Sequence, residues 1–277
     1  KKYSFNFNYG ILKKQIRFSL PLMFAVFAFF FIDSSDRYLL KVFLPVSEIG
    51  LYSIGYQLGL VMMLFVGGFS SAWPPYYHKN NQNNEGQSIC NQALTMYMLP
   101  AAFFAVLISI ASQFILRVLT TDAFHSAYTV VPFVALAYML KGPYLIFLIG
   151  IAIKNKTSWQ LYLEAIAAAL NIVLNILLIP IIGREAAAMT TLLSYSILVI
   201  GSYIMVSRIN PIPGSLYKPM LTIGISTLVC LFTLLPFFST KYFIWAPLLF
   251  LTFTISIFIL FKREIVLIKN SIALSNK

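Results

Sequence analysis

The chain has 277 residues, of which 60% are hydrophobic and only 10% are charged. Soluble domains carry about 25% charged residues, so the composition excludes an ordinary soluble protein and indicates one that spans a membrane. The net charge of +12 does not indicate a nucleic-acid partner, because the basic residues lie at the ends of apolar runs and form no patch with interleaved aromatic residues.

Residues 1–16 are mixed polar and aromatic, and we expect them to form a cytoplasmic lead-in. Eight apolar runs follow, each near or above the roughly 20 residues that a spanning helix needs. They are 18–43, 48–76, 92–118, 129–153, 159–182, 186–207, 219–238 and 243–261. Backbone groups must be paired in lipid, and no run shows the alternation of a barrel strand. The sequence therefore predicts an all-α polytopic membrane protein with about eight transmembrane helices.

Eight crossings place both ends of the chain on one side of the membrane. With the N-terminus in the cytoplasm, fourteen basic residues lie on that side and five on the other, while Lys141 lies in mid-span. The positive-inside rule therefore predicts that both termini are cytoplasmic. The proline-containing segment 208–218 reads as a cytoplasmic connector between a six-helix bundle, 17–207, and a C-terminal helix pair with a cytoplasmic tail, 219–277.

The first apolar run contains three ionisable residues, Asp33, Asp36 and Arg37, which are costly at membrane depth and therefore candidates for function. Asp33 and Arg37 are one helical turn apart and can form a structural ion pair. Alternatively, Arg37 faces a cavity and binds an anionic group such as a phosphate, for which its planar fork is suited. Asp36 has Leu40 at the fourth following position, so it is a candidate for pairing with another bundle or for proton coupling.

Two further spans carry buried polar residues. Lys141 lies near the middle of 129–153, where a lysine needs a wet cavity or an acidic partner. Glu164, Asn171 and Asn175 lie on one face of 159–182. They are expected either to form interhelical hydrogen bonds or to line a polar cavity that contacts sugar hydroxyls, with Glu164 as an ion-coupling or gating site alongside Asp33 and Asp36.

No metal or cofactor is expected. The two cysteines lie far apart, and the two histidines have no partner at ligand spacing. The chain has no phosphate-binding loop, no zinc-protease motif and no nucleophile elbow, so we expect that it is not an enzyme.

An ordered series of short motifs resembles the polysaccharide-export flippases of the Wzx type, within the wider MOP group that also contains the MATE exporters. The series runs over 17–207 and includes Ser35-Asp36-Arg37-Tyr38-Leu39-Leu40, Ile49-Gly50-Leu51-Tyr52-Ser53, Ala72-Trp73-Pro74-Pro75, Lys154-Asn155-Lys156-Thr157 and Asn171-Ile172-Val173-Leu174-Asn175. By this resemblance, 17–207 is the second six-helix bundle of a MOP-type transporter, and the chain is an internal or C-terminal fragment that lacks six upstream spans.

The resemblance implies a transporter of the bacterial inner membrane. It would flip an undecaprenyl-diphosphate-linked oligosaccharide, such as an O-antigen (lipopolysaccharide), capsule or exopolysaccharide unit, by alternating access coupled to an ion gradient. Arg37, Lys141, Asn171 and Asn175 would bind substrate. The partners would be the lipid-linked oligosaccharide, membrane lipids and other polysaccharide assembly proteins. A MATE-like exporter of organic cations is the second hypothesis, and a polysaccharide polymerase or ligase is the third.

Overall fold

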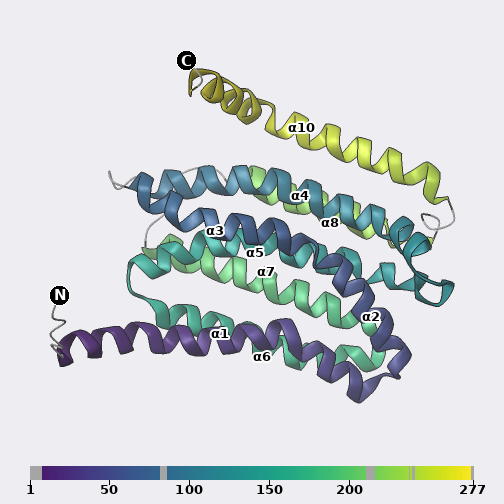
Figure 1. Cartoon of the computed structure of the whole chain (residues 1–277), viewed down its shortest axis with the longest axis horizontal. Helices are drawn as coiled ribbons and strands as arrows, with labels where there is room; N and C mark the ends of the chain where they lie inside the picture. The colour runs from purple at the N-terminus through teal and green to yellow at the C-terminus, as the bar shows by residue number, and fades with distance from the viewer. Residues whose placement is uncertain (1–7, 82–85, 210–215, 237, 239–240, 276–277) are drawn as a thin grey trace, which may run out of the picture.

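The computed structural model describes residues 8–81, 86–209, 216–236, 238 and 241–275, and it contains no strand in these ranges (Figure 1). The first helix, α1, is Tyr9–Phe43 and has 35 residues. It begins after Asn8, whose Oδ1 accepts hydrogen bonds from the N–H groups of Gly10 and Ile11 at 3.0 and 3.2 Å, which satisfies two free donors of the first turn. A helix of this length extends about 52 Å and passes beyond the hydrocarbon core. Residues 9–16 of the expected lead-in therefore belong to α1, and 1–7 lie outside the described residues.

The second apolar run, expected as one helix over 48–76, is broken. It forms α2 (Val46–Gly59) and α3 (Met62–Asn80), which meet at an angle of 44°. Backbone bonds between residues three apart carry the chain through the break: the Val61 N–H donates to the Leu58 carbonyl at 3.3 Å. Hydrogen bonds between residues three apart wind the backbone more tightly than an α-helix does. The two prolines of this run lie deep inside α3, so the bend has no proline at its vertex.

The remaining helices match the predicted runs with shifted ends. They are α4 (Gly86–Leu119), the 3₁₀ helix η2 (Asp122–Thr129), α5 (Val131–Ile153), α6 (Thr157–Ile182), α7 (Arg184–Ile209), α8 (Tyr217–Phe232) and α10 (Tyr242–Ser275). Six described helices are long and apolar enough to cross a membrane, and the bent α2–α3 pair makes a seventh candidate span. The helix expected over 219–238 ends at Phe232, and α8 is shorter than a full span, with 16 residues. The connector residues 210–215 lie outside the described part.

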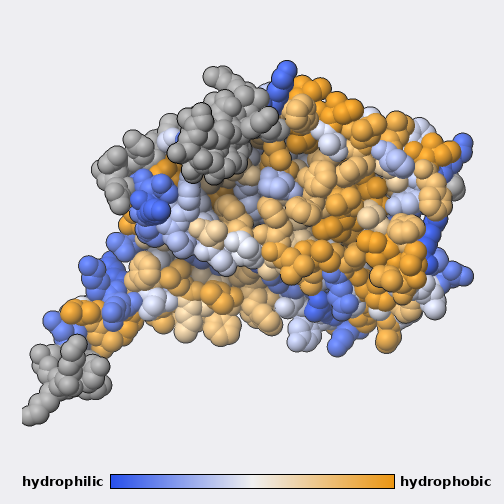
Figure 2. Space-filling view, turned by 45° about the horizontal axis from the view of Figure 1, so that its top comes forward, coloured by the Kyte–Doolittle hydropathy of each residue, from blue (hydrophilic) through white to orange (hydrophobic). Residues whose placement is uncertain are grey.

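The helices lie side by side, with α5 and α7 in the middle, α1 and α6 along one edge and α10 along the opposite edge (Figure 1). We compared an apolar stretch of 18 residues in each helix. In α5, 67% of this stretch is buried, compared with 11% in α1 and 17% in α10. Figure 2 shows an apolar surface over much of one face, with hydrophilic residues gathered mainly toward its two ends. This distribution and the long apolar helices identify a multi-pass, all-α membrane protein.

Candidate functional site

The two carboxylates of α1 each accept a hydrogen bond from a tyrosine on another helix. Asp36 is completely buried, and its Oδ2 accepts a hydrogen bond from the Tyr52 hydroxyl on α2. The Oδ1 of Asp33 accepts a hydrogen bond from the Tyr195 hydroxyl on α7, at 2.8 Å. A buried carboxylate without a partner is costly, so these bonds fix the register of α1 against α2 and α7. They also commit Asp36 to a partner inside this bundle, which does not fit the expected pairing with another bundle.

Arg37 does not form the ion pair with Asp33 that the sequence allowed. None of the ion pairs among the described residues includes Arg37. Its side chain is exposed, and its Cζ lies 5.0 Å from the ring centroid of Tyr56. A guanidinium at this distance is attracted to the ring face while its N–H groups stay available for an anion.

Lys141 of α5 points between α1 and α3. Its Nζ lies 4.5 Å from the ring centroid of Phe29 on α1 and 3.9 Å from the Sδ atom of Met63 on α3. It also lies 5.6 Å from the ring centroid of Tyr138, one turn earlier on α5. The ion pairs within the described ranges do not include this ammonium group. The expected acidic partner is therefore absent from its immediate contacts, and aromatic faces take that place.

A hydrogen-bonded pair of tyrosines connects the two cations. The hydroxyls of Tyr56 and Tyr138 are 2.6 Å apart. Arg37 lies over the first ring and Lys141 over the second. Phe29, which Lys141 also contacts, and Arg37 are eight residues apart on α1, which separates them by about 12 Å along the helix axis. The structure therefore places the two positive groups over the rings of one hydrogen-bonded tyrosine pair.

Sequence reasoning missed the tyrosines of this cluster. Tyr52, Tyr56, Tyr138 and Tyr195 are all buried, and their rings contact one another at centroid distances of 5.5 to 6.3 Å. Buried tyrosine hydroxyls usually find a hydrogen-bond partner. The spacing of Tyr52 and Tyr56, one helical turn apart on a span that follows two aspartates, is the sequence signal that could have identified them.

Glu164 of α6 is buried and is bonded to a tyrosine of α5. Its Oε1 accepts hydrogen bonds from the Tyr144 hydroxyl and, at 2.9 Å, from the Gln160 Nε2. Its Oε2 is buried and has no hydrogen-bond partner in the described structure. Glu164 is only 2% exposed, and its Oε2 is therefore a buried acceptor that receives no hydrogen bond in the described structure.

Asn171 and Asn175 form interhelical hydrogen bonds, which was one of the two alternatives drawn from the sequence. The Asn171 Oδ1 accepts from the Ser35 hydroxyl of α1 and from the Asn175 Nδ2, both at 3.0 Å. The Asn175 Oδ1 accepts from the Thr190 hydroxyl of α7 at 2.7 Å. Both asparagines are completely buried, so in this conformation they tie α1, α6 and α7 together and do not line an open surface.

A second polar cluster joins α2, η2 and α7 at one end of the bundle. The Arg184 guanidinium donates a hydrogen bond to Glu48 Oε2 and lies 3.2 Å, from Nε, from Glu185 Oε1. It also donates to the Ser126 carbonyl at 3.3 Å, and Glu185 accepts from the Thr129 hydroxyl at 2.7 Å. The sequence analysis assigned no role to Arg184 or Glu185. The structure shows that they close one end of the helix bundle.

No group of three or more histidine, cysteine, aspartate or glutamate side chains in the described ranges could hold a metal ion. Cys90 and Cys230 are both buried free thiols. The ionisable residues of the candidate site are thus joined by tyrosine and amide hydrogen bonds and by cation–ring contacts.

Comparison with known proteins gives a distant similarity to a flippase. Over 173 residues the chain is 25% identical to the Probable low-salt glycan biosynthesis flippase Agl15 of Haloferax volcanii. The match covers 61% of this chain and 36% of the relative, so the chain corresponds to little more than a third of that curated protein. No family model matches the chain, and no solved structure matches it significantly.

Proposed function

We propose that the chain belongs to a transporter that flips lipid-linked glycans across a membrane, and that it is not an enzyme. Its multi-pass helical fold and its similarity to a glycan biosynthesis flippase support this function. Because the match covers only 36% of the relative, the activity of a whole protein is part of the proposal.

The proposal rests on one observation. Arg37 and Lys141 lie over the rings of Tyr56 and Tyr138, whose hydroxyls are hydrogen-bonded to each other. Arg37 and Lys141 both contact aromatic rings and form no ion pair among the described side chains. An ionisable residue at membrane depth is usually paired or faces a wet cavity, and it marks a substrate pathway. The diphosphate of a lipid-linked glycan supplies a negative charge that can bind both groups directly. A guanidinium binds it through a planar fork and an ammonium as a point charge.

The finer proposal concerns the substrate, the membrane and the mechanism. The substrate is an undecaprenyl-diphosphate-linked oligosaccharide, and the membrane is the bacterial inner membrane, with both termini of this chain in the cytoplasm. The six helices of 17–207 form one wall of a cavity that opens alternately to each side. Arg37 and Lys141 bind the diphosphate. Asn171 and Asn175, buried in this conformation, contact sugar hydroxyls when α1 separates from α6.

Ion coupling is assigned to Asp33, Asp36 and Glu164. Each carboxylate accepts a tyrosine hydroxyl, so a change in its charge alters a contact between helices. The unused Oε2 of Glu164 offers an acceptor to a proton or a cation. These contacts give the transport cycle a place where ion binding changes helix packing.

The burial of the acidic groups argues against an exporter of organic cations. Such a transporter needs accessible acidic side chains in its cavity, whereas Asp36 is completely buried and Glu164 is 2% exposed. Asp33 is partly buried and bonded to Tyr195. The accessible ionisable group of this cluster is instead Arg37. A knockout strain with altered drug sensitivity and normal surface glycan would favour the exporter. Altered glycan chain length with normal flipping would favour a polymerase or ligase.

The test is deletion of the full gene in its host, followed by complementation with the wild-type gene or with Lys141→Met. Deletion is expected to remove the surface polysaccharide and to accumulate lipid-linked units on the cytoplasmic face, measured by extraction and mass spectrometry. Lys154→Met is the matched control, because Lys154 is an exposed lysine in the turn after α5. A deletion strain with normal surface glycan and no accumulated intermediate would overturn the proposal.

A further inference from the structure

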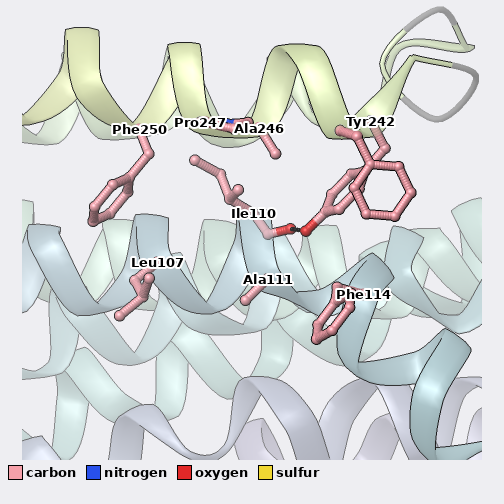
Figure 3. Close-up of a pocket in the computed structure, with 9 residues that line it drawn as sticks. Leu107, Ile110, Ala111, Phe114, Tyr242, Ala246, Pro247 and Phe250 are labelled. Carbon is pink, nitrogen blue, oxygen red and sulfur yellow. Dashed lines mark hydrogen bonds between the residues drawn. The ribbon is translucent and has the colours of Figure 1, made fainter.

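An apolar crevice lies beside α10, at the edge of the bundle opposite α1 (Figures 1 and 3). It has a volume of about 310 Å³ and lies between α4 and α10. Both walls belong to segments long and apolar enough to span a membrane, 88–119 and 242–262. Its volume is at the lower end of the roughly 300–1,000 Å³ of small-molecule sites, so it has room for one narrow ligand.

Small side chains on both helices create the space. In Figure 3, Ala111 lies on the α4 side and Ala246 and Pro247 on the α10 side, and larger residues stand at the two ends. At one end, Phe250 contacts Phe103 with ring centroids 5.2 Å apart. At the other end, the Tyr242 hydroxyl donates a hydrogen bond to a backbone carbonyl of α4 at 2.9 Å. Aromatic rings therefore hold the two helices together at each end and leave a gap between them.

Two basic residues stand at the Tyr242 end. Arg117 lies in the last turn of α4, and its Cζ is 5.8 Å from the ring centroid of Tyr242. Lys241 immediately precedes α10, and both basic side chains are exposed. From Leu107 at the far end, α4 rises about 15 Å to Arg117, which is close to half of the roughly 30 Å hydrocarbon thickness. An apolar slot one leaflet deep thus ends at two positive charges.

We propose that this crevice binds one acyl chain of an anionic membrane phospholipid, whose phosphate contacts Arg117 and Lys241. The apolar walls match a hydrocarbon chain, and the basic end matches the charge of the headgroup. The site is separate from the candidate substrate site, because Arg37 lies on α1, Lys141 of α5 contacts α1 and α3, and the crevice lies between α4 and α10 at the opposite edge. The phospholipid fills the gap and joins α10 to α4.

The test uses the full-length protein, purified in mild detergent and analysed by native mass spectrometry. Phosphatidylglycerol and phosphatidylcholine with identical chains compete for the protein. Each basic residue near the surface favours the anionic lipid by about fivefold, so the two together predict a preference of roughly 25-fold. Phosphatidylglycerol with a photoreactive group in its chain is expected to label 107–114 and 242–250.

Two variants examine the two halves of the proposal. Ala246→Leu fills the crevice and is expected to abolish retention of either lipid. Arg117→Gln with Lys241→Gln is expected to retain lipid and to lose the preference for phosphatidylglycerol. The control for the filling variant is Gly68→Leu, which places the same side chain in the groove between α3 and α4. The control for the charge variant is Lys154→Gln with Lys156→Gln, in the turn between α5 and α6.

Three results would overturn the proposal. The first is equal retention of the two phospholipids by the wild-type protein. The second is photolabelling confined to the α3–α4 groove. The third is displacement of phosphatidylglycerol from 107–114 and 242–250 by a polyprenyl diphosphate at equal concentration, because the crevice would then be a site for the transported lipid.

Discussion

The α1 edge and the α10 edge of this protein are held by different interactions. At the α1 edge, Asp33, Asp36 and Ser35 each make a hydrogen bond with a residue of another helix. At the α10 edge, aromatic contacts and one hydrogen bond from Tyr242 to a backbone carbonyl join the helix to α4 across an apolar gap. Directional bonds specify one arrangement of helices, whereas apolar contacts of this kind let a lipid take part in the packing.

This difference predicts how strongly substitutions at each edge should affect the protein. Removing a polar group at the α1 edge leaves a buried partner without its bond, which is costly in a low-dielectric interior. An apolar helix surface in lipid gains little from burial, since lipid tails are themselves apolar. Substitutions at polar positions of the inner bundle should therefore change stability or transport more than substitutions near α8 and α10.

The largest effect is expected for transport by Lys141→Met. A hydrogen bond to a charged group contributes about 1.5–3 kcal/mol, so loss of the ammonium predicts a 10- to 150-fold lower flipping rate. Flipping of a fluorescent lipid-linked oligosaccharide by full-length protein in liposomes measures it. Thermal stability should not fall, because the described structure gives Lys141 no ion pair to lose. Normal flipping by this variant would remove Lys141 from the site, and Lys141→Arg, which keeps the charge, should retain more activity than Met.

A smaller effect is expected for stability from Asn175→Leu. Asn175 bonds to Asn171 and Thr190, and both partners would keep buried polar atoms without their present bonds. We expect the free energy of unfolding to fall by about 1–3 kcal/mol, measured by unfolding in sodium dodecyl sulfate. Thr190→Ser keeps the hydroxyl and serves as the control. If the Leu variant were as stable as Thr190→Ser, the network would not be what holds α6 to α7.

Tyr138→Phe should have a modest effect on stability and a measurable effect on transport. It removes the hydroxyl that contacts Tyr56 and keeps the ring under Lys141. Interhelical hydrogen bonds in membrane proteins contribute about 0.6 kcal/mol on average, so stability should fall by about that amount. Unfolding and flipping are measured on the same sample. A change in the flipping rate beyond that of the reciprocal variant, Tyr56→Phe, would show that the two hydroxyls are not equivalent.

The smallest effect is expected for Ser226→Ala in α8. The Ser226 hydroxyl is completely buried and has no hydrogen-bond partner in the described structure. Its removal relieves an unpaired polar group and improves helix propensity, so the free energy of unfolding should stay within about 0.5 kcal/mol of wild type or rise. A loss of stability as large as that of Asn175→Leu would contradict the contrast between the two edges.

The sequence was sufficient to predict the helical membrane fold, because hydrophobic runs and unpaired backbone groups leave few alternatives in lipid. It did not predict the break at Leu60 and Val61. No proline marks that position, and the close approach of α2 to α5 comes from tertiary packing: a Cβ on Gly59 would lie 2.6 Å from the Cβ of Val134. The lengths of α1 and α10 were underestimated, because polar residues continue each helix beyond its apolar run.

The roles of the candidate site residues stay predictions, and their contacts could not be read from the sequence. Asn171 and Asn175 were placed correctly on one face of a helix, since their spacing alone determines this. Their partners Ser35 and Thr190 come from other helices, and spacing along one chain carries no information about them. The pairing of Asp33 with Arg37 was wrong because a tyrosine from α7 takes that carboxylate. The neighbouring helix that each of these side chains meets depends on the rotation of α1 about its axis, and packing sets that rotation.

The bend between α2 and α3 divides one candidate membrane span into two segments that share α4 and α5 as neighbours, and α2 alone also packs extensively against η2 and α7. α2 packs against η2, α4, α5 and α7, and Arg184 forms an ion pair with Glu48 in its first turn. α3 packs against α4 and α5. Hydrogen bonds between residues three apart form the bend, and no proline lies there. The direction of each segment is therefore set by the helices that it packs against. A displacement of η2 or α7 would therefore act on α2, whose tyrosines lie beside the aspartates of α1, before it acts on α3.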